Sequence, residues 1–168
     1  MARKNYSLFH SSMQKLAASP PGAWFFSRTQ HHFDRVILKL TNNKATMTSI
    51  LAGLPVVILT STGAKSGLPR KAPLLCIQDD SDPNKIAVIA TNWGQSHYPA
   101  WYYNLKANPR ATGLISGHNG DYSVHEAEGD EYDKFWQLAA DTYIGYPLYK
   151  KRINNRHIPI MILTLIEA

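Results

Sequence analysis

Two different spacings of apolar residues divide this chain into a helical part and a strand-rich part. From Tyr6 to Ala17 and from Ala23 to Leu40, apolar residues recur every three or four positions, which predicts two amphipathic helices. The sequence Ser19-Pro20-Pro21-Gly22 predicts a break between them. We expect both helices to pack against a core. Contact with an anionic lipid surface is the alternative, because basic side chains lie among the apolar ones.

After Pro55 the pattern changes to short β-rich runs separated by turns. Six strands are predicted, at residues 56–61, 72–78, 86–91, 111–116, 122–128 and 158–166, with turns at 63–67, 79–84 and 117–120. Three of these runs are almost continuously apolar, which indicates burial on both faces. Further helices are expected from Pro99 and from Asp130, with Asp130 as the N-cap.

The order of these elements predicts a mainly β protein with packing helices, of the α+β class, built on a small β-barrel. We expect residues 1–50 to form an N-terminal amphipathic helical segment and residues 51–168 to form the barrel domain. The apolar stretch at 50–59 is about half as long as a membrane-spanning helix. Since the N-terminus also lacks a continuous apolar signal-peptide core, we expect a cytoplasmic protein.

Composition adds a preference for anionic partners. The chain has 168 residues, 44% of them hydrophobic, and carries a formal charge of +6 with a pI near 9.4. Nucleic acid, a membrane surface or a polyanionic cofactor would each suit this charge. Cys76 is the single cysteine, so a disulfide framework is excluded and a buried, inert thiol is expected. The seven histidines show no metal-ligand spacing, and no metal site is predicted.

The basic turn between the first two predicted strands is a candidate site for an anionic ligand. Lys65, Arg70 and Lys71 supply positive charge to it. The same segment also contains hydroxyl groups, which can donate hydrogen bonds, and glycines, which let backbone N–H groups come close to a ligand. The hydroxyls are those of Thr60, Ser61, Thr62 and Ser66, and the glycines are Gly63 and Gly67. The nucleotide P-loop needs four residues between its first glycine and a Gly-Lys-Ser/Thr run. Here Gly63 stands only two residues before Lys65, so a P-loop is excluded. An exposed hairpin turn with solvated lysines is the alternative.

Two aromatic segments are further candidates. A polar turn at 91–98 leads into a helix in which Trp101 and Asn104 share a face, so an aromatic ring and an amide could lie beside a planar ligand. Tyr143, Tyr146 and Tyr149 recur every three residues, and Gly145 and Pro147 indicate a broken helix there. These tyrosines could line a mobile flap, or they could pack on the barrel with their hydroxyls in solvent.

Three segments together resemble the deazaflavin-dependent nitroreductase family. They are residues 59–70, residues 99–109, and the tyrosines ahead of Arg156-His157-Ile158-Pro159, and the resemblance covers roughly residues 50–166. It implies a split β-barrel similar to that of FMN-binding proteins. It further implies that the chain binds coenzyme F420 and transfers hydride from the reduced coenzyme to quinones, nitroaromatic compounds or other activated acceptors.

The resemblance also implies roles for particular residues. The acidic tail of F420 would be held by Ala64, Lys65, Ser66, Arg70 and Lys71. The deazaflavin ring would lie beside Ala72, Pro73, Leu74 and Leu75, the neighbouring Ile89, Ala90, Thr91 and Asn92, and Ala100, Trp101, Tyr102, Tyr103 and Asn104.

The resemblance implies that Tyr146 would approach the ring and the acceptor, and that Tyr143 and Tyr149 would shape the acceptor pocket. A separate hypothesis concerns the reaction itself: a hydroxyl of Thr91 or of a tyrosine of the flap, such as Tyr146, would hydrogen-bond the acceptor oxygen as charge develops. The chain departs from the family at Trp93, where a small residue is usual, so its bulk would narrow or re-aim the acceptor side, and activation of nitroimidazoles is not implied. It departs again at Leu75, where the best-known nitroreductase has tyrosine.

Other functions stay open at this point. An FMN-dependent oxidoreductase on the same barrel would need less positive charge, because FMN has one phosphate. A non-catalytic protein that binds F420 or a lipid would account for the apolar N-terminal segment. Nucleic-acid binding is supported by charge alone, since no RNA-binding aromatic motif is present. We expect a monomer or homodimer, with peripheral membrane contact of the N-terminal helices as an open alternative.

Overall fold

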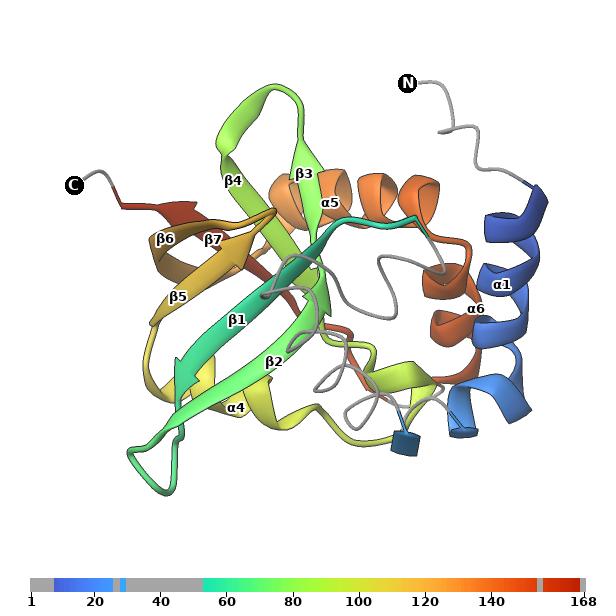
Figure 1. Ribbon diagram of the computed structural model, residues 1–168, viewed down its shortest axis with the longest axis horizontal. Coiled ribbons are helices and arrows are strands. Elements are labelled where there is room, and N and C mark those ends of the chain that lie inside the picture. Colours follow the sequence, from blue (N-terminus) through green and yellow to red (C-terminus); the bar gives the residue numbers. More distant parts are fainter. Residues whose placement is uncertain (1–7, 26–27, 30–52, 154–155, 167–168) are drawn as a thin grey trace.

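The computed structural model describes residues 8–25, 28–29, 53–153 and 156–166 (Figure 1). Seven antiparallel strands form one sheet, in the order β2-β1-β5-β6-β7-β4-β3. The strands are β1 (Val56–Thr62), β2 (Pro69–Leu75), β3 (Ile77–Asp79), β4 (Asp82–Ile89), β5 (Arg110–Ile115), β6 (His118–Glu126) and β7 (Ile160–Leu165). The mainly β class with packing helices is therefore confirmed.

The sheet curls because its two edge strands are consecutive in the chain. β2 and β3 occupy opposite ends of the strand order, yet only Cys76 separates them. A single stretch of chain thus leaves one edge of the sheet and enters the other, which brings the edges together into a barrel-like shape (Figure 1). The Cys76 N–H donates a hydrogen bond to the Pro55 carbonyl at 3.0 Å, which fixes the bend.

This bend corrects the predicted strand count. The single strand expected at 72–78 is divided at Cys76 into β2 and β3, so the sheet has seven strands and not six. The turn predicted at 117–120 is also too long, because β6 begins at His118. Ser116 and Gly117 make this turn by themselves, with φ angles of 50° and 89°, as two-residue hairpin turns require.

Alternating side chains of the same strands build two separate cores. Ala87 and Ile89 of β4 point to one cluster, whereas Ile86 and Val88 point to the other. β7 alternates in the same way. One cluster fills the inside of the curled sheet, and the other lies between its outer face and helices α5 and α6. Burial on both faces, predicted from the apolar runs, is confirmed for β4 and β7.

Three helices cover the sheet. α4 (Ala100–Ala107) inserts Trp101 and Leu105 into the core inside the sheet, while α5 (Gly129–Thr142) and α6 (Gly145–Arg152) pack on the outer face. The predicted N-cap of α5 is wrong by two residues. Glu128 has the extended N-cap conformation, and Gly129, with a φ of 52°, begins the helix. Asp130 lies in the first turn, where its charge complements the helix dipole.

The N-terminal helix α1 (Leu8–Ala18) packs against α6 (Figure 1). Gln14 and Ala18 are buried, and the carbonyls of Ala17 and Ala18 at the end of α1 accept hydrogen bonds from Tyr149 and Arg152. Such donors satisfy the carbonyl groups that a helix leaves unpaired at its C-terminus. Packing against a core is therefore confirmed for this helix.

The predicted break at 19–22 is reduced to one residue. The Ser19 side chain accepts a hydrogen bond from the Gly22 N–H at 3.2 Å, as an N-cap does, and residues 20–25 are helical again. Pro20 and Pro21 occupy the first helical positions, where no N–H is needed, so they begin a helix where the pattern suggested a loop. The rest of the predicted second helix and the boundary at residue 50 lie outside the described residues.

Large apolar side chains are exposed near this N-terminal turn. Leu16, Trp24 and Phe25 are 56%, 61% and 48% exposed, and the Arg28 guanidinium lies 4.5 Å from the Trp24 ring centre. Among the described residues, none belongs to a helix long and apolar enough to cross a membrane. Peripheral membrane contact stays a prediction.

Candidate functional site

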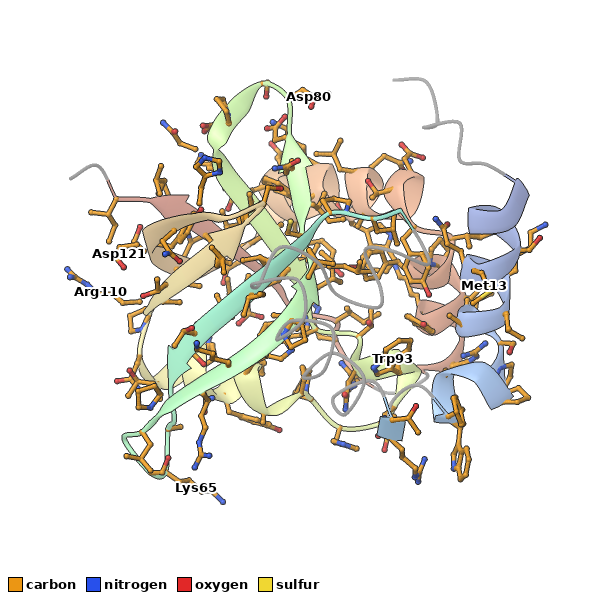
Figure 2. All side chains as sticks on the ribbon, in the orientation of Figure 1. Met13, Lys65, Asp80, Trp93, Arg110 and Asp121 are labelled. Atoms are coloured by element: carbon orange, nitrogen blue, oxygen red, sulfur yellow. The ribbon has the colours of Figure 1, made fainter. Side chains whose placement is uncertain are left out.

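The basic turn forms the tip of the β1–β2 hairpin. The Gly63 N–H donates to the Leu68 carbonyl at 2.9 Å, and the Gly67 N–H donates to the Gly63 carbonyl at 2.8 Å. Gly67 has a φ of 65°, a conformation that glycine adopts without strain. Lys65 points away from the sheet at this tip (Figure 2), and Arg70 and Lys71 are also exposed. The hairpin therefore presents three cationic groups to solvent.

The side chain of Asn104 in α4 holds this turn through two hydrogen bonds. Its side-chain oxygen accepts a hydrogen bond from the Ala64 N–H at 3.0 Å, and its amide nitrogen donates to the Ser61 hydroxyl at 3.3 Å. Asn104 is buried, its bond to Ser61 is buried and its bond to Ala64 is part-buried, so the two bonds hold the hairpin on the helix with little access for water. Direct contact between Asn104 and a cofactor stays a prediction.

The predicted ring-binding segments of β2 and β4 come together. β2 is at one end of the strand order and pairs only with β1 among the described strands, so its other edge leaves backbone N–H and C=O groups without a strand partner. Residues 72–75 of β2 are half-buried, and β2 also contacts β4, whose end carries Ile89 and Ala90. A planar ligand could lie along this edge and hydrogen-bond to the backbone.

The five α4 residues predicted to lie beside the ring, 100–104, are divided between two faces of the helix. Trp101 and Asn104 share the buried face, as predicted. Trp101 belongs to the core inside the sheet, whereas Ala100 and Tyr103 are exposed. Tyr98, Tyr102 and Tyr103 form a cluster in which neighbouring ring centres lie 4.8 to 6.0 Å apart. A ligand on the open side of α4 would meet Ala100 and Tyr103, and Trp101 would support the helix from inside.

The loop after β4 has an unusual backbone. Asn92, Trp93 and Gly94 have φ angles of 47°, 59° and 81°, a run of left-handed residues of which only one is glycine. Such conformations cost roughly 1–3 kcal/mol each and cluster at functional sites. The half-buried Trp93 ring meets the Tyr149 ring edge-on, with 6.2 Å between the ring centres. The loop therefore connects the predicted ring site to the tyrosines.

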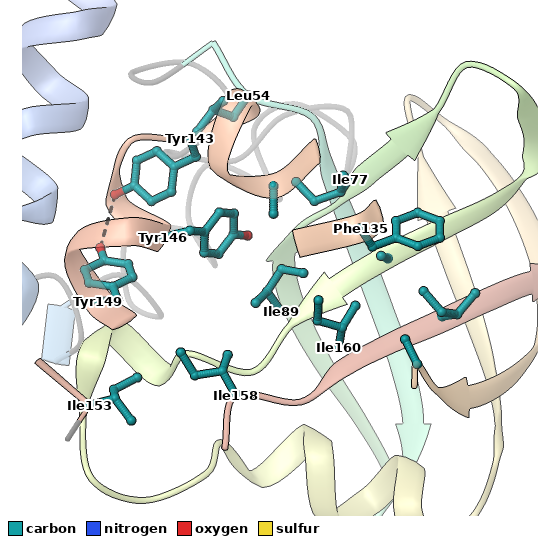
Figure 3. Packing of buried hydrophobic residues seen from close by; sticks show 14 of the residues in the cluster. Leu54, Ile77, Ile89, Phe135, Tyr143, Tyr146, Tyr149, Ile153, Ile158 and Ile160 are labelled. Atoms are coloured by element: carbon teal, nitrogen blue, oxygen red, sulfur yellow. Dashed lines mark hydrogen bonds between the residues drawn. The ribbon is translucent and has the colours of Figure 1, made fainter. Parts of the chain in front are cut away.

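Tyr143, Tyr146 and Tyr149 are all buried in the outer core (Figure 3). The hydroxyls of Tyr143 and Tyr149 lie 3.1 Å apart and share a hydrogen bond, so the alternative of solvated hydroxyls is wrong. The helix break predicted from Gly145 falls between α5 and α6, and Pro147 is tolerated in the first turn of α6. Burial raises the pKa values of all three tyrosines, so they are protonated at neutral pH.

Three buried residues carry a hydroxyl group without a hydrogen-bond partner among the described residues. They are Tyr122, at 9% exposure, and the more deeply buried Tyr146 and Thr91, which are 3% and 5% exposed and are also the two predicted catalytic groups. A buried polar group without a partner costs about 1–3 kcal/mol and calls for an explanation. A ligand that accepts hydrogen bonds would supply the missing partners.

Arg156 is a residue of this region that sequence analysis missed. Its guanidinium donates hydrogen bonds to the carbonyls of Ala90, Thr91 and Gln95, which lie 61 to 66 residues earlier in the chain. No local pattern signals such a distant contact, although Arg156 begins one of the segments that carried the resemblance.

Cys76 is buried at the bend between β2 and β3, which confirms the predicted burial of this thiol. Burial raises its pKa to about 12, so the thiol is protonated at neutral pH. Within the described ranges, no group of three or more His, Cys, Asp or Glu side chains could hold a metal ion.

Comparison with known proteins identifies the family. The sequence model of the F420H(2)-dependent quinone reductases matches residues 32–165, which include the hairpin, the loop after β4 and all three tyrosines. The chain belongs to this family. It is thus an F420-dependent reductase with coenzyme F420 as its cofactor, which confirms the resemblance found in the sequence.

Individual relatives carry the name of the same family. A Mycobacterium tuberculosis protein that carries the name of an F420H(2)-dependent quinone reductase, Rv3178, is 32% identical over 110 residues, which cover 66% of this chain and 89% of the relative. Another from the same organism, the F420H(2)-dependent quinone reductase Rv1261c, is 28% identical over 113 residues, covering 66% and 73%.

Solved structures share the fold of this F420-dependent reductase. The F420-H2 dependent reductase FDR-A is 35% identical with a TM-score of 0.59, and the match covers 65% of this chain and 93% of that one. A structure described as a domain-swapped dimer is 30% identical with a TM-score of 0.61, over 85% and 98% of the two chains.

Proposed function

We propose that this reductase transfers a hydride from reduced F420 to a quinone, with the acceptor oxygen bound by the hydroxyls of Tyr146 and Thr91. The observation that carries the proposal is that these two deeply buried hydroxyls have no hydrogen-bond partners among the described residues. Tyr146 belongs to the outer core together with Ile89, the last residue of β4, and Thr91 follows Ile89 by two residues in the chain. A quinone carbonyl accepts hydrogen bonds and would satisfy them.

The cationic hairpin suits the acidic tail of the cofactor. Lys65, Arg70 and Lys71 are exposed and free to approach carboxylate and phosphate groups, and the backbone of the turn is held in place by Asn104. Figure 2 shows Lys65 and Trp93 well separated, with Lys65 at the tip of the β1–β2 hairpin and Trp93 in the loop after β4. A long cofactor with its tail at the hairpin could therefore extend its ring toward Trp93 and Tyr146.

The edge of β2 suits the ring of the cofactor. Backbone groups of this edge between 72 and 75 can accept and donate hydrogen bonds in the plane of a flat heterocycle, except that Pro73 offers a carbonyl and no N–H. When bound, reduced F420 supplies the hydride, and the protein orients donor and acceptor. Barrel closure at Cys76 supports the finer assignment to the split β-barrels of FMN-binding proteins.

The protonation state of Tyr146 determines its proposed role in the reaction. Because burial keeps Tyr146 protonated at neutral pH, its O–H can donate a hydrogen bond to the acceptor oxygen while negative charge develops there. The hydride brings two electrons and one hydrogen nucleus, and a solvent proton completes the hydroquinone. Tyr146 thus acts as a hydrogen-bond donor and needs no transfer of its own proton.

The acceptor is proposed from the relatives, whose names specify quinones. Trp93 is half-buried beside Tyr149, so its bulk would narrow or re-aim the acceptor side of the site. We therefore expect quinones with a flat, unhindered ring to react faster than nitroimidazoles. Nitroaromatic compounds form the second acceptor class to be compared in the same assay.

A titration with F420 and with FMN tests the cofactor site. We expect F420 to bind with micromolar affinity, and the double variant Lys65→Ala, Arg70→Ala to bind at least tenfold more weakly, which corresponds to about 1.4 kcal/mol. Lys85→Ala is the control, because Lys85 pairs with Asp82 on the β3–β4 hairpin, away from the site. Preferential binding of FMN would contradict the assignment.

Stopped-flow mixing with a menaquinone analogue then separates an enzyme from a carrier. Reduced F420 bound to the protein should be oxidised on mixing, at a rate that saturates with the analogue. If the bound coenzyme stays reduced, the protein is a non-catalytic F420-binding protein and the proposed reaction is wrong.

A further inference from the structure

The Arg156 guanidinium uses all five of its N–H groups on backbone carbonyls. Nε donates to Gln95 at 3.1 Å, Nη1 to Ala90 at 3.1 Å and to His157 at 3.2 Å, and Nη2 to Thr91 at 2.9 Å and to Gln95 at 3.0 Å. The guanidinium carbon also lies 4.7 Å from the centre of the Tyr98 ring. Among the described residues, Arg156 has no acidic partner.

The carbonyls that Arg156 holds are placed on both sides of the strained residues. Ala90 and Thr91 precede Asn92 and Trp93, and Gln95 follows them. Left-handed conformations of non-glycine residues persist only where surrounding contacts determine them. The contacts within the loop are few: the Gly94 and Gln95 amides donate to Thr91 and Asn92, and the Asn92 side chain donates to the His97 carbonyl.

We propose that Arg156 is a positioning residue, which clamps the loop at 90–95 and so orients Thr91 and Trp93 for hydride transfer to the acceptor. This inference rests on the proposed function for its catalytic consequence. The clamp itself is a structural claim that can be tested separately. Arg156 would not touch the reacting atoms, and it would act through the backbone that carries Thr91.

Arginine is required here because of its shape. Its planar fork directs five donors in fixed directions, whereas a lysine ammonium has three donors on a single nitrogen atom. A lysine at 156 could reach one or two of the four carbonyls but could not bridge Ala90 and Gln95 together. Burial lowers the pKa of Arg156, yet the guanidinium stays charged at neutral pH.

The test compares Arg156→Met and Arg156→Lys with a control of similar structural cost, Lys134→Met. Lys134 donates to Asp79 and Ser81 between α5 and the β3–β4 hairpin, so its loss should destabilise the protein and leave the loop intact. Each protein is measured for melting temperature, F420 affinity, the saturating single-turnover rate with a menaquinone analogue, and hydrogen exchange of the peptide covering residues 90–98.

We expect a distinct result for Arg156→Met. Amides of residues 90–98 should exchange at least tenfold faster than in the wild type, and the saturating hydride-transfer rate should fall at least tenfold. The F420 dissociation constant should change less than the rate does, by severalfold at most, since the hairpin proposed to hold the tail is untouched. Arg156→Lys should resemble Arg156→Met, and Lys134→Met should keep wild-type exchange in this peptide.

The outcomes separate the two proposals. Exchange in Arg156→Met equal to that of the wild type would overturn the clamp. Faster exchange with a rate within twofold of Lys134→Met would overturn the role of Arg156 in hydride transfer and leave the proposed function standing. If the wild type binds F420 but transfers no hydride to quinones, the proposed function fails, and the exchange data still decide whether Arg156 holds the loop.

Discussion

At the scale of single residues, three tyrosines with the same spacing have different environments. Tyr143 and Tyr149 share a hydrogen bond at 3.1 Å, and Tyr149 also donates to the Ala17 carbonyl. Tyr146 lies between them in the chain and is equally buried, but its hydroxyl has no hydrogen-bond partner among the described residues. A polar group that costs stability is retained more readily when it serves a reaction.

This difference predicts opposite effects on stability and on activity. Replacing Tyr146 by Phe removes only the hydroxyl, so the melting temperature should stay unchanged or rise, because this hydroxyl makes no hydrogen bond within the part of the chain that the structure describes. The rate of quinone reduction should fall by about ten- to a hundredfold, because the acceptor oxygen loses a donor. Thermal unfolding and single-turnover kinetics check the two parts.

Tyr132→Phe is the matched control for this substitution. Tyr132 stacks on Trp136 over α5, and its change to Phe should leave the rate of quinone reduction as it is. An unchanged rate in Tyr146→Phe would remove the hydroxyl from the mechanism and leave the ring a packing role only.

At the scale of elements, the β1–β2 hairpin and α4 form one unit joined by Asn104. Its amide group bonds to Ala64 at the tip of the hairpin and to Ser61 within β1, 40 and 43 residues away in the chain. A second contact, from the Asn108 amide to the Thr62 carbonyl at 3.5 Å, lies on the same side. The shape of the cationic turn thus depends on a helix that carries none of its charge.

Asn104→Ala should therefore weaken both the fold and the cofactor site. The loss of two buried hydrogen bonds should lower the free energy of unfolding by about 1–3 kcal/mol. F420 affinity should fall only severalfold, because Lys65 and Arg70 remain. Denaturant unfolding and fluorescence titration measure the two effects. A large loss of affinity with unchanged stability would instead indicate that Asn104 touches the cofactor directly.

Elements were predictable where local spacing determines them. The apolar runs gave the strands, and Gly63 and Gly67 gave the basic turn, because each depends on residues close together in the chain. The division of one strand at Cys76 could not be predicted, since residues 72–78 read as one apolar run whether or not the strand bends.

The hydrogen bonds of Asn104 and Arg156 could likewise not be predicted from the sequence. Each joins segments that are adjacent only after the sheet has curled. The residues proposed to bind the cofactor tail were predicted from charge and glycine content, whereas the residues that hold those segments in shape carry no local signal.

At the scale of the whole molecule, hydrogen bonds hold the helical layer at two distant places, one between two helices and one to the sheet. Arg152 and Tyr149 fix α6 to the end of α1. Lys134 of α5 donates to Asp79 and Ser81 of the β3–β4 hairpin, and Asp79 is buried. The outer core that contains Tyr146 lies between these attachments, so its packing depends on both.

The attachment at Asp79 predicts how stability changes with pH. Hydrogen bonds from Lys134 and Ser81 lower the pKa of Asp79 from 3.8 to about 2. Since the pKa is lower in the folded state, the contribution of Asp79 to stability is complete above pH 3.8 and is lost as the pH falls toward 2. Lys134→Met should lower the free energy of unfolding by about 1–3 kcal/mol at pH 7.

The difference between wild type and Lys134→Met should shrink steadily between pH 4 and pH 2, because protonated Asp79 no longer gains from the ammonium group. Urea unfolding at a series of pH values measures it. Lys85→Met provides the comparison: its pair with Asp82 is exposed at 3.5 Å, so its loss should change stability by less than about 1 kcal/mol at any pH. A difference for Lys134→Met that is independent of pH would mean that Lys134 acts through its packing on Phe135 and not through its charge.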